Sequence, residues 1–251
     1  MAEAATAPRA QTSPARDPLL SVRNLEAWYG ESHVLHGVSF DVYPGEVVTL
    51  LGRNGAGKTT TLKSVMGILP KRKGSVVFQG KELMHVPARY VAREGIAFCP
   101  EERGIFSSLS VEENLMLPPQ VKPGGMTVEQ IFELFPNLKE RLSSQGTKLS
   151  GGEQQMLTTA RSILGQPSVL LLDEPLEGLA PVICDELMAA FSALAATGAM
   201  TILMIEQRIQ AALNFAQDVF ILERGEIAWS GTPAQLEGEP ETVERLLGVA
   251  H

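Results

Sequence analysis

Residues 47–60 read Val-Val-Thr-Leu-Leu-Gly-Arg-Asn-Gly-Ala-Gly-Lys-Thr-Thr and contain the most specific pattern in the sequence. Its first five residues are apolar on both faces of a predicted strand, as is typical of a strand buried in a parallel sheet. Residues 52–59 match the motif Gly-x-x-x-x-Gly-Lys-Thr. A predicted helix over 59–66 follows, which is the context that this motif requires. The stretch therefore predicts an α/β fold that binds a nucleoside triphosphate, and the alternative is an incidental glycine-rich turn.

The residue types in this loop explain how it would hold a triphosphate. Glycines lack a Cβ, so the backbone N–H groups can surround a phosphate at the positive end of the following helix. Lys58 would reach the β- and γ-phosphates, and the Thr59 hydroxyl would coordinate Mg²⁺. The predicted nucleotide-binding residues of the loop are Gly52, Arg53, Asn54, Gly55, Ala56, Gly57, Lys58, Thr59 and Thr60.

A second apolar strand, predicted over 169–172, ends in the two acids Asp173 and Glu174. The carboxyl end of a buried parallel strand faces the ligand crevice, so both acids are expected beside the loop. Asp173 would belong to the Mg²⁺ shell, and Glu174 would act as the general base that polarises the attacking water. Without the upstream loop, the same residues would be interpreted as a core strand followed by an acidic turn.

Composition limits the class of protein. The chain has 251 residues, 44% of them hydrophobic, and a formal net charge of −8. These values are typical of a globular protein with a sizeable core, and the acidity argues against nucleic acid as a partner. Apolar runs such as 47–51 are much shorter than the roughly 18 residues that a membrane helix needs. The two cysteines, Cys99 and Cys184, form no CxxC pair and are expected to be buried thiols of a cytoplasmic protein.

The distribution of residue types along the chain predicts its organisation. Residues 1–17, rich in Ala, Pro, Thr and Arg, predict a disordered tail. Short strands with turns between them over 19–80 predict antiparallel β structure, and helices predominate over about 101–165. Beyond that segment, strands alternate with helices, which predicts a parallel sheet core with an antiparallel β subdomain and a helical insertion. The individual expectations are strands over 34–42, 76–78 and 201–205, helices over 111–115, 128–135, 182–196 and 208–216, and a hairpin of 219–223 with 227–229. Pro136 is expected to stop the helix over 128–135.

Residues 149–155 read Leu-Ser-Gly-Gly-Glu-Gln-Gln and form a second unusual helix start. Ser150 and Glu153 have the spacing of a capping box, which predicts a helix over 154–164. Gly151 and Gly152 in the first turn cost helix stability unless another group must approach their backbone closely. Exposed N–H groups at a helix start form an anion site, so these glycines predict a second contact with phosphate.

With these three motifs in order, the sequence from about 19 to 248 resembles the ATP-binding cassette (ABC) family. The resemblance implies an ABC-type P-loop NTPase domain over 18–251, in which Ser150, Gly151 and Gly152 contact the γ-phosphate held by a partner subunit. Each chain would then supply half of each catalytic site. The resemblance also places Tyr29 where the family has an aromatic ring that stacks on adenine, and a half-buried strand Tyr is the alternative.

Two positions depart from the usual family pattern. Glu101 lies where a Gln is usual, and Gln207 lies where a His is usual. Both replacements are usual in the LivF-type branch, which the segments PEERGIF, SVEENL, LLLDEPLEGLAP and IEQ also resemble. The resemblance implies that Gln207 hydrogen-bonds the γ-phosphate in the catalytic site, and that Glu101 contributes to nucleotide and metal binding.

The LivF-type resemblance implies an ATPase that binds ATP and Mg²⁺ and drives the import of branched-chain or related amino acids. Its implied partners are a second ATP-binding subunit of the same or a different chain, two membrane permease subunits and, indirectly, an extracytoplasmic solute-binding protein. The permeases would hold it at the inner face of the cell membrane. Because of Glu177, the import of urea or short amides remains an alternative function. Two further alternatives are a soluble ABC protein without a transport role and a low-turnover ATP-binding regulatory module.

Two histidines complete the set of candidate ligands. His33 and His36 are three residues apart in a predicted strand, a spacing that points their side chains to opposite faces. With no Cys and no further His nearby, this segment is not expected to bind a metal ion.

Overall fold

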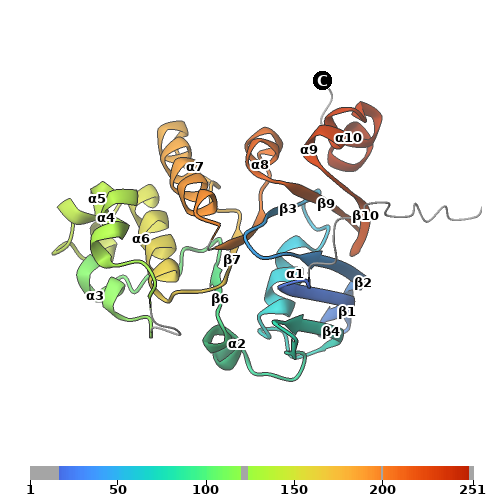
Figure 1. Ribbon diagram of the computed structural model, residues 1–251, viewed down its shortest axis with the longest axis horizontal. Helices are drawn as coiled ribbons and strands as arrows, with labels where there is room; N and C mark the ends of the chain where they lie inside the picture. The colour runs from blue at the N-terminus through green and yellow to red at the C-terminus, as the bar shows by residue number, and fades with distance from the viewer. Residues whose placement is uncertain (1–16, 120–123, 199, 249–251) are drawn as a thin grey trace, which may run out of the picture.

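Two β-sheets and the helices packed on them organise the chain (Figure 1). The computed structural model describes residues 17–119, 124–198 and 200–248. The tail predicted over 1–17 therefore lies outside the described residues except for Asp17, which is exposed. Within the described residues, no helix is both long and apolar enough to cross a bilayer.

The larger sheet has six strands in the order β10-β9-β3-β8-β7-β6. Its strands are β3 (Val47–Leu51), β6 (Ile96–Cys99), β7 (Val169–Asp173), β8 (Thr201–Ile205), β9 (Asp218–Glu223) and β10 (Glu226–Gly231). All pairs from β9 to β6 are parallel, and β10 pairs with β9 as the predicted antiparallel hairpin. Every residue of β3, β7 and β8 is buried, which confirms the parallel core predicted from their apolar sequences.

Alternation along the parallel strands divides the apolar interior into two cores. In β7, Val169 and Leu171 face a core shared with the antiparallel sheet and with α1 (Lys58–Val65). Leu170 and Leu172 face the other core, which contains residues of α6 (Gly151–Leu164) and α7 (Pro181–Ala196). Successive strand residues point to opposite faces, so one apolar strand supplies both cores.

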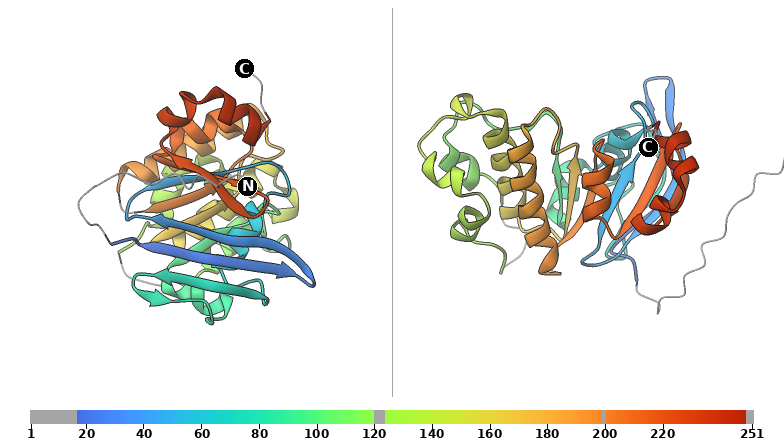
Figure 2. Two further views of the ribbon diagram at one scale, coloured as in Figure 1. Left: turned by 90° about the vertical axis from the view of Figure 1, so that its right-hand side faces the viewer. Right: turned by 90° about the horizontal axis from the view of Figure 1, so that it is seen from above.

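The smaller sheet is antiparallel, as predicted, in the order β2-β1-β4-β5, and Figure 2 shows its long strands at one end of the molecule. Its strands are β1 (Leu20–Tyr29), β2 (Ser32–Val42), β4 (Arg72–Phe78) and β5 (Lys81–Glu82).

The prediction that His33 and His36 point to opposite faces is wrong, because their ring centroids lie 4.1 Å apart. In the pairing of β1 with β2, Leu35 faces Ala27 and His33 faces Trp28. Val34 is therefore an extra residue. Such a bulge shifts the alternation by one residue and brings the two rings to the same side.

The chain between β6 and β7 is helical, as the sequence predicts. Its elements are α3 (Val111–Met116), α4 (Val128–Leu134), α5 (Pro136–Glu140), the 3₁₀ helix η1 (Gly146–Lys148) and α6. Ser110, Thr127 and Ser150 each accept a hydrogen bond from the third residue of their helix, so all three helices begin with a capping box. α4 ends before Pro136 as expected, but the same proline also begins α5, because the first helical position needs no N–H.

The remaining helices extend the pattern of the sequence. α7 and α8 (Ile209–Phe215) lie within a residue of their predicted ranges. The sequence did not predict α2 (Ala88–Glu94), α9 (Pro233–Glu237) or α10 (Pro240–Leu247). Cys99 and Cys184 are free and buried, as predicted.

Candidate functional site

The loop between β3 and α1 has a backbone that only glycine permits at two positions. Gly52 has φ +147°, and a Cβ there would lie 2.4 Å from the carbonyl oxygen of Leu222. Gly57, at the N-cap of α1, has φ +108°, and a Cβ would lie 2.7 Å from Leu35. The loop is therefore wedged between β9 and β2, with its N–H groups arranged around the start of α1.

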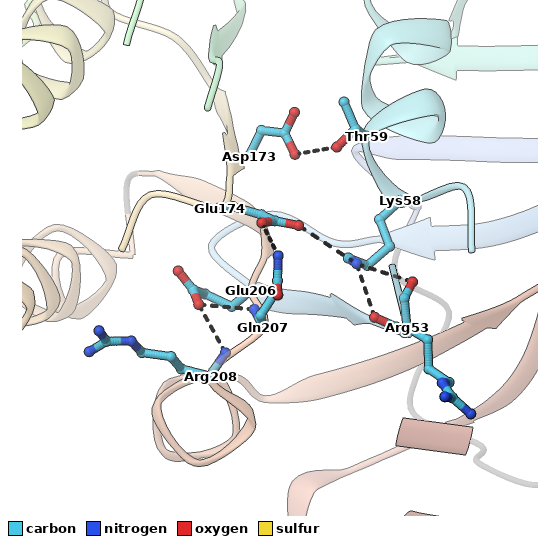
Figure 3. Close-up of polar contacts among 9 residues, drawn as sticks. Arg53, Lys58, Thr59, Asp173, Glu174, Glu206, Gln207 and Arg208 are labelled. Atoms are coloured by element: carbon cyan, nitrogen blue, oxygen red, sulfur yellow. Dashed lines mark hydrogen bonds and ion pairs between the residues drawn. The ribbon is translucent and has the colours of Figure 1, made fainter. Parts of the chain in front are cut away.

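Lys58 is buried at the first residue of α1 and turns back into the loop. Its Nζ donates a hydrogen bond to the carbonyl oxygen of Gly52 at 2.9 Å and lies 3.5 Å from that of Arg53. The same Nζ lies 3.7 Å from Oε1 of Glu174, so the lysine spans the loop and the acid at the end of β7 (Figure 3). These contacts place a buried positive charge where an incoming triphosphate would lie.

Thr59 and Asp173 meet as the two strands predict. The Thr59 hydroxyl donates to Oδ1 of Asp173 at 2.8 Å. Burial raises the pKa of Asp173 to about 6, the Thr59 hydrogen bond opposes this rise, and the charge of Glu174 adds to it. A cation bound at this pair would offset the cost of burying the carboxylate.

Both side chains offer hard oxygen donors, which suit Mg²⁺. Among the described residues no group of three His, Cys, Asp or Glu side chains is placed to hold a metal ion. Mg²⁺ bound by such a pair of side chains commonly keeps water or phosphate oxygens as its other ligands.

Glu174 is held in an unusual backbone conformation. Its φ is +49°, in the left-handed region, which costs a residue other than glycine about 1–3 kcal/mol. Its carboxylate is buried and accepts a hydrogen bond from the side-chain amide of Gln207 (Figure 3). The structure thus joins the two predicted catalytic residues, and it adds Lys58 to the same carboxylate.

A third acid, Glu206, belongs to this cluster and was not identified from the sequence. It follows β8 directly and is buried, and its carboxylate accepts hydrogen bonds from three backbone N–H groups. Burial raises the pKa of Glu206, while these hydrogen bonds oppose the rise. Its signal in the sequence is a charged residue immediately after an apolar strand, the same signal that identified Asp173 and Glu174.

Two predicted residues, Glu101 and Tyr29, take no part in these contacts among the described residues. Glu101, in the turn after β6, is exposed, and the structure records it near the pair only through its charge, which raises the pKa of Asp173. No hydrogen bond connects it with Thr59 or Asp173 in the part of the chain that the structure describes. Tyr29 ends β1 with its side chain 46% exposed, so its ring is accessible for stacking.

The Ser-Gly-Gly start of α6 lies apart from the phosphate loop. Ser150 is exposed at the N-cap, and a Cβ on Gly151 would lie 3.0 Å from the Arg103 guanidinium. A Cβ on Gly152 would lie 2.7 Å from Ile183, so both glycines allow close approach. Figure 1 and Figure 2 show α6 among the helices at one end of the molecule and α1 beside the antiparallel sheet.

Comparisons with known proteins agree with this geometry. The model of the ABC transporter family matches residues 35–177. The high-affinity branched-chain amino acid transport ATP-binding protein BraG of Pseudomonas aeruginosa is 38% identical, over 92% of this chain and all of that protein. The lipopolysaccharide export system ATP-binding protein LptB of Escherichia coli K12 is 33% identical, over 90% of this chain and 95% of that protein.

Solved structures share the fold over most of the chain. A nucleotide-free ATP-binding cassette from an ABC transporter superposes with a TM-score of 0.77 at 24% identity, covering 94% of this chain and all of the other. An ATP-binding subunit of an ABC transporter superposes with a TM-score of 0.74 at 30% identity, covering 88% of this chain and 92% of the other. The chain therefore belongs to the ABC transporter family and is one of its ATPase cassettes.

Proposed function

We propose that the chain is the ATP-hydrolysing subunit of an importer for branched-chain or related amino acids. The observation that carries the proposal is the similarity to BraG along that protein's entire length. A probable branched-chain amino acid transport ATP-binding protein, LivF of Archaeoglobus fulgidus, supports it at 32% identity over 91% of this chain. The paired Glu174 and Gln207 supply the hydrolytic chemistry that such a subunit needs.

The hydrolysis uses the described contacts as follows. The triphosphate enters the loop, and Lys58 Nζ exchanges the carbonyl oxygens of Gly52 and Arg53 for phosphate oxygens. Glu174 accepts a proton from the water that attacks the γ-phosphorus, the bond to the β-phosphate oxygen breaks, and ADP and phosphate leave. Gln207 orients the Glu174 carboxylate through its amide. Thr59 and Asp173 would hold Mg²⁺, which neutralises charge on the phosphates.

A second ATP-binding subunit would complete each site. Ser150 is exposed at the N-cap of α6, and Figure 1 shows this helix on the opposite side of the larger sheet from α1, the helix that follows the phosphate loop. The N–H groups of this helix start fit a phosphate presented by another subunit. The adenine of the nucleotide would stack on the exposed ring of Tyr29, and Glu101 would contribute its charge near the metal.

Permease subunits would dock on the segment around α3. Phe106, Met116 and Leu117 are exposed there, and Met116 is 73% exposed. The loop that carries Phe106 is fixed to α3, because the buried Asn114 amide bonds both the N–H and the C=O of Phe106. Docking at this segment would hold the chain at the cytoplasmic face of a membrane and transmit the motion of hydrolysis. A solute-binding protein would act outside the membrane.

A transport assay tests this proposal. Uptake of labelled leucine is measured in cells that lack the gene and carry either the wild-type chain or Glu174→Gln. We expect uptake with the wild-type chain and loss of uptake with the variant. Uptake of labelled urea in place of leucine would assign the substrate to the urea and short-amide alternative.

The similarity to LptB favours one second candidate, an export ATPase for lipopolysaccharide. Recovery of lipopolysaccharide transport to the cell surface, with leucine uptake unchanged, would establish that candidate. Equal phosphate release by wild-type and Glu174→Gln proteins would instead refute the hydrolytic assignment.

A further inference from the structure

The carboxylate of Glu206 joins two loops of the site. Its Oε1 accepts the backbone N–H of Leu176 at 2.9 Å, in the loop that follows β7. Its Oε2 accepts the backbone N–H groups of Gln207 at 3.0 Å and Arg208 at 3.1 Å, in the loop that follows β8. The residue is 3% exposed, so water does not replace these acceptors readily.

These two loops carry the residues that must meet. Leu176 is two residues beyond Glu174, whose own N–H donates to the carbonyl oxygen of Ile205 at 2.9 Å. The left-handed turn at Glu174 is therefore fixed on both sides, by the carbonyl of Ile205 and by the carboxylate of Glu206. A strained conformation persists only where its surroundings hold it, and Glu206 supplies one of these two anchors.

Arg208 adds a second connection between the same loops. Its guanidinium lies 3.2 Å from Sγ of Cys184 and 3.5 Å from the carbonyl oxygen of Leu179. Together, Glu206 and Arg208 fasten the loop over residues 174–180 to the loop that presents Gln207. A displacement of either loop therefore changes the contact between the Gln207 amide and the Glu174 carboxylate.

We propose that Glu206 is a positioning residue for ATP hydrolysis, which holds Gln207 and Glu174 in register through the three N–H groups that it binds. The inference rests on the proposed role of Glu174 as general base. Glu206 does not touch the loop over residues 52–57 through any hydrogen bond or ion pair in the described part of the chain. It lines the same cavity as Gly52, Arg53 and Asn54. Its three hydrogen bonds, however, are to the loops of Glu174 and Gln207, so we expect it to change the rate of the chemical step more than the affinity for nucleotide.

The variants Glu206→Gln and Glu206→Ala test this role. Gln keeps one acceptor oxygen, whereas Ala leaves all three N–H groups without the side chain. We expect the rate of hydrolysis to decrease from Glu to Gln to Ala, by about tenfold to a hundredfold for Ala, as for other misplaced catalytic groups. The affinity for ATP, measured by titration with Mg²⁺ and ATP, should stay within about twofold.

Controls separate positioning from stability. Glu226→Gln removes a charge from an exposed acid of β10 and should leave the rate unchanged. Leu236→Ala opens the packing around a buried residue of α9 and should lower the melting temperature with the rate within about twofold. In a Gln207→Ala background, Glu206→Gln should lower the rate of hydrolysis clearly less than it does in the wild type, since both changes disrupt the same contact between Gln207 and Glu174. All proteins are full-length chains, purified with the subunits that accompany them.

Three results would overturn the inference. The first is a wild-type rate in Glu206→Gln and Glu206→Ala beside an inactive Glu174→Gln, which leaves the proposed function intact. The second is a loss of hydrolysis rate in the Glu206 variants that is no larger than the loss in Leu236→Ala, when the compared variants have equal melting temperatures. The third is an equal loss in the wild-type and Gln207→Ala backgrounds. An active Glu174→Gln would instead remove the general base, and the inference with it.

Discussion

Asp173 holds a buried charge that its surroundings disfavour, so its removal should stabilise the chain while abolishing hydrolysis. Its pKa rises from 3.8 to about 6 on folding, chiefly through burial. A shift of that size corresponds to about 3 kcal/mol at 1.36 kcal/mol per unit. Asp173→Asn keeps an acceptor for the Thr59 hydroxyl but introduces an amide N–H₂ that needs a partner, so we expect a net gain of about 1–3 kcal/mol at pH 8.

The stability gained by Asp173→Asn should change with pH in one defined direction. Between pH 4 and pH 6 the folded wild-type chain binds the Asp173 proton more tightly than the unfolded chain does. The destabilisation by this carboxylate is therefore fully present above about pH 6 and disappears as the pH falls toward 4. The stability difference between the variant and the wild type should shrink in the same interval.

Urea unfolding in EDTA at several values from pH 8 to pH 5 measures this difference. Asp185→Asn, on the exposed side of α7, is the matched control and should show little difference at any pH. Adding Mg²⁺ and ATP should reverse the order, because the ligands stabilise the wild-type chain more. An Asp173→Asn variant that is less stable than the wild type at pH 8, or a stability difference that does not change with pH, would contradict the cost assigned to burying this carboxylate.

Three further predictions concern single side chains. Glu174→Gln should retain ATP binding and lose about 10²- to 10⁴-fold in hydrolysis, measured as phosphate release at saturating ATP, and an equal loss of affinity would contradict this. Gly57→Ala should destabilise the chain by about 1–3 kcal/mol in thermal unfolding, because a Cβ there meets Leu35 at 2.7 Å with φ +108°, and an unchanged melting temperature would count against it. Asn114→Leu should lower the free energy of unfolding in urea by about 2–5 kcal/mol, because the buried amide bonds the N–H and C=O of Phe106 and two further carbonyl oxygens. A neutral effect would mean that the loop carrying Phe106 is not fixed to α3.

The sequence was informative wherever one local pattern determined the structure. The apolar sequence of β3, followed by glycines and Lys58, predicted a buried strand and a phosphate loop. The capping box at Ser150 predicted the start of α6, although the predicted helix began three residues later than the observed one. The two acids at the end of β7 were expected beside the loop because parallel strands deliver their carboxyl ends to one edge of the sheet, and Asp173 does contact Thr59 while Glu174 lies near Lys58.

Features that depend on pairing between distant segments were not predictable in this way. The bulge at Val34 arises from the register of β2 against β1, which no residue in β2 alone specifies. Glu101 lies two residues beyond the parallel strand β6, yet its turn leaves it exposed, whereas Asp173 at the end of β7 is buried. Glu206 was overlooked although its signal was present, since its role requires N–H groups from a loop 30 residues earlier in the chain.

The division of one sheet between two cores has a consequence for local unfolding. β7 and β8 contribute buried residues to both cores, so neither core can open without exposing apolar residues of the other. Amide protons of these strands should exchange with solvent only when the entire chain unfolds, whereas those of α9 and α10 should exchange through smaller openings. The acids at the end of β7 thus lie on the part of the molecule that is expected to unfold last.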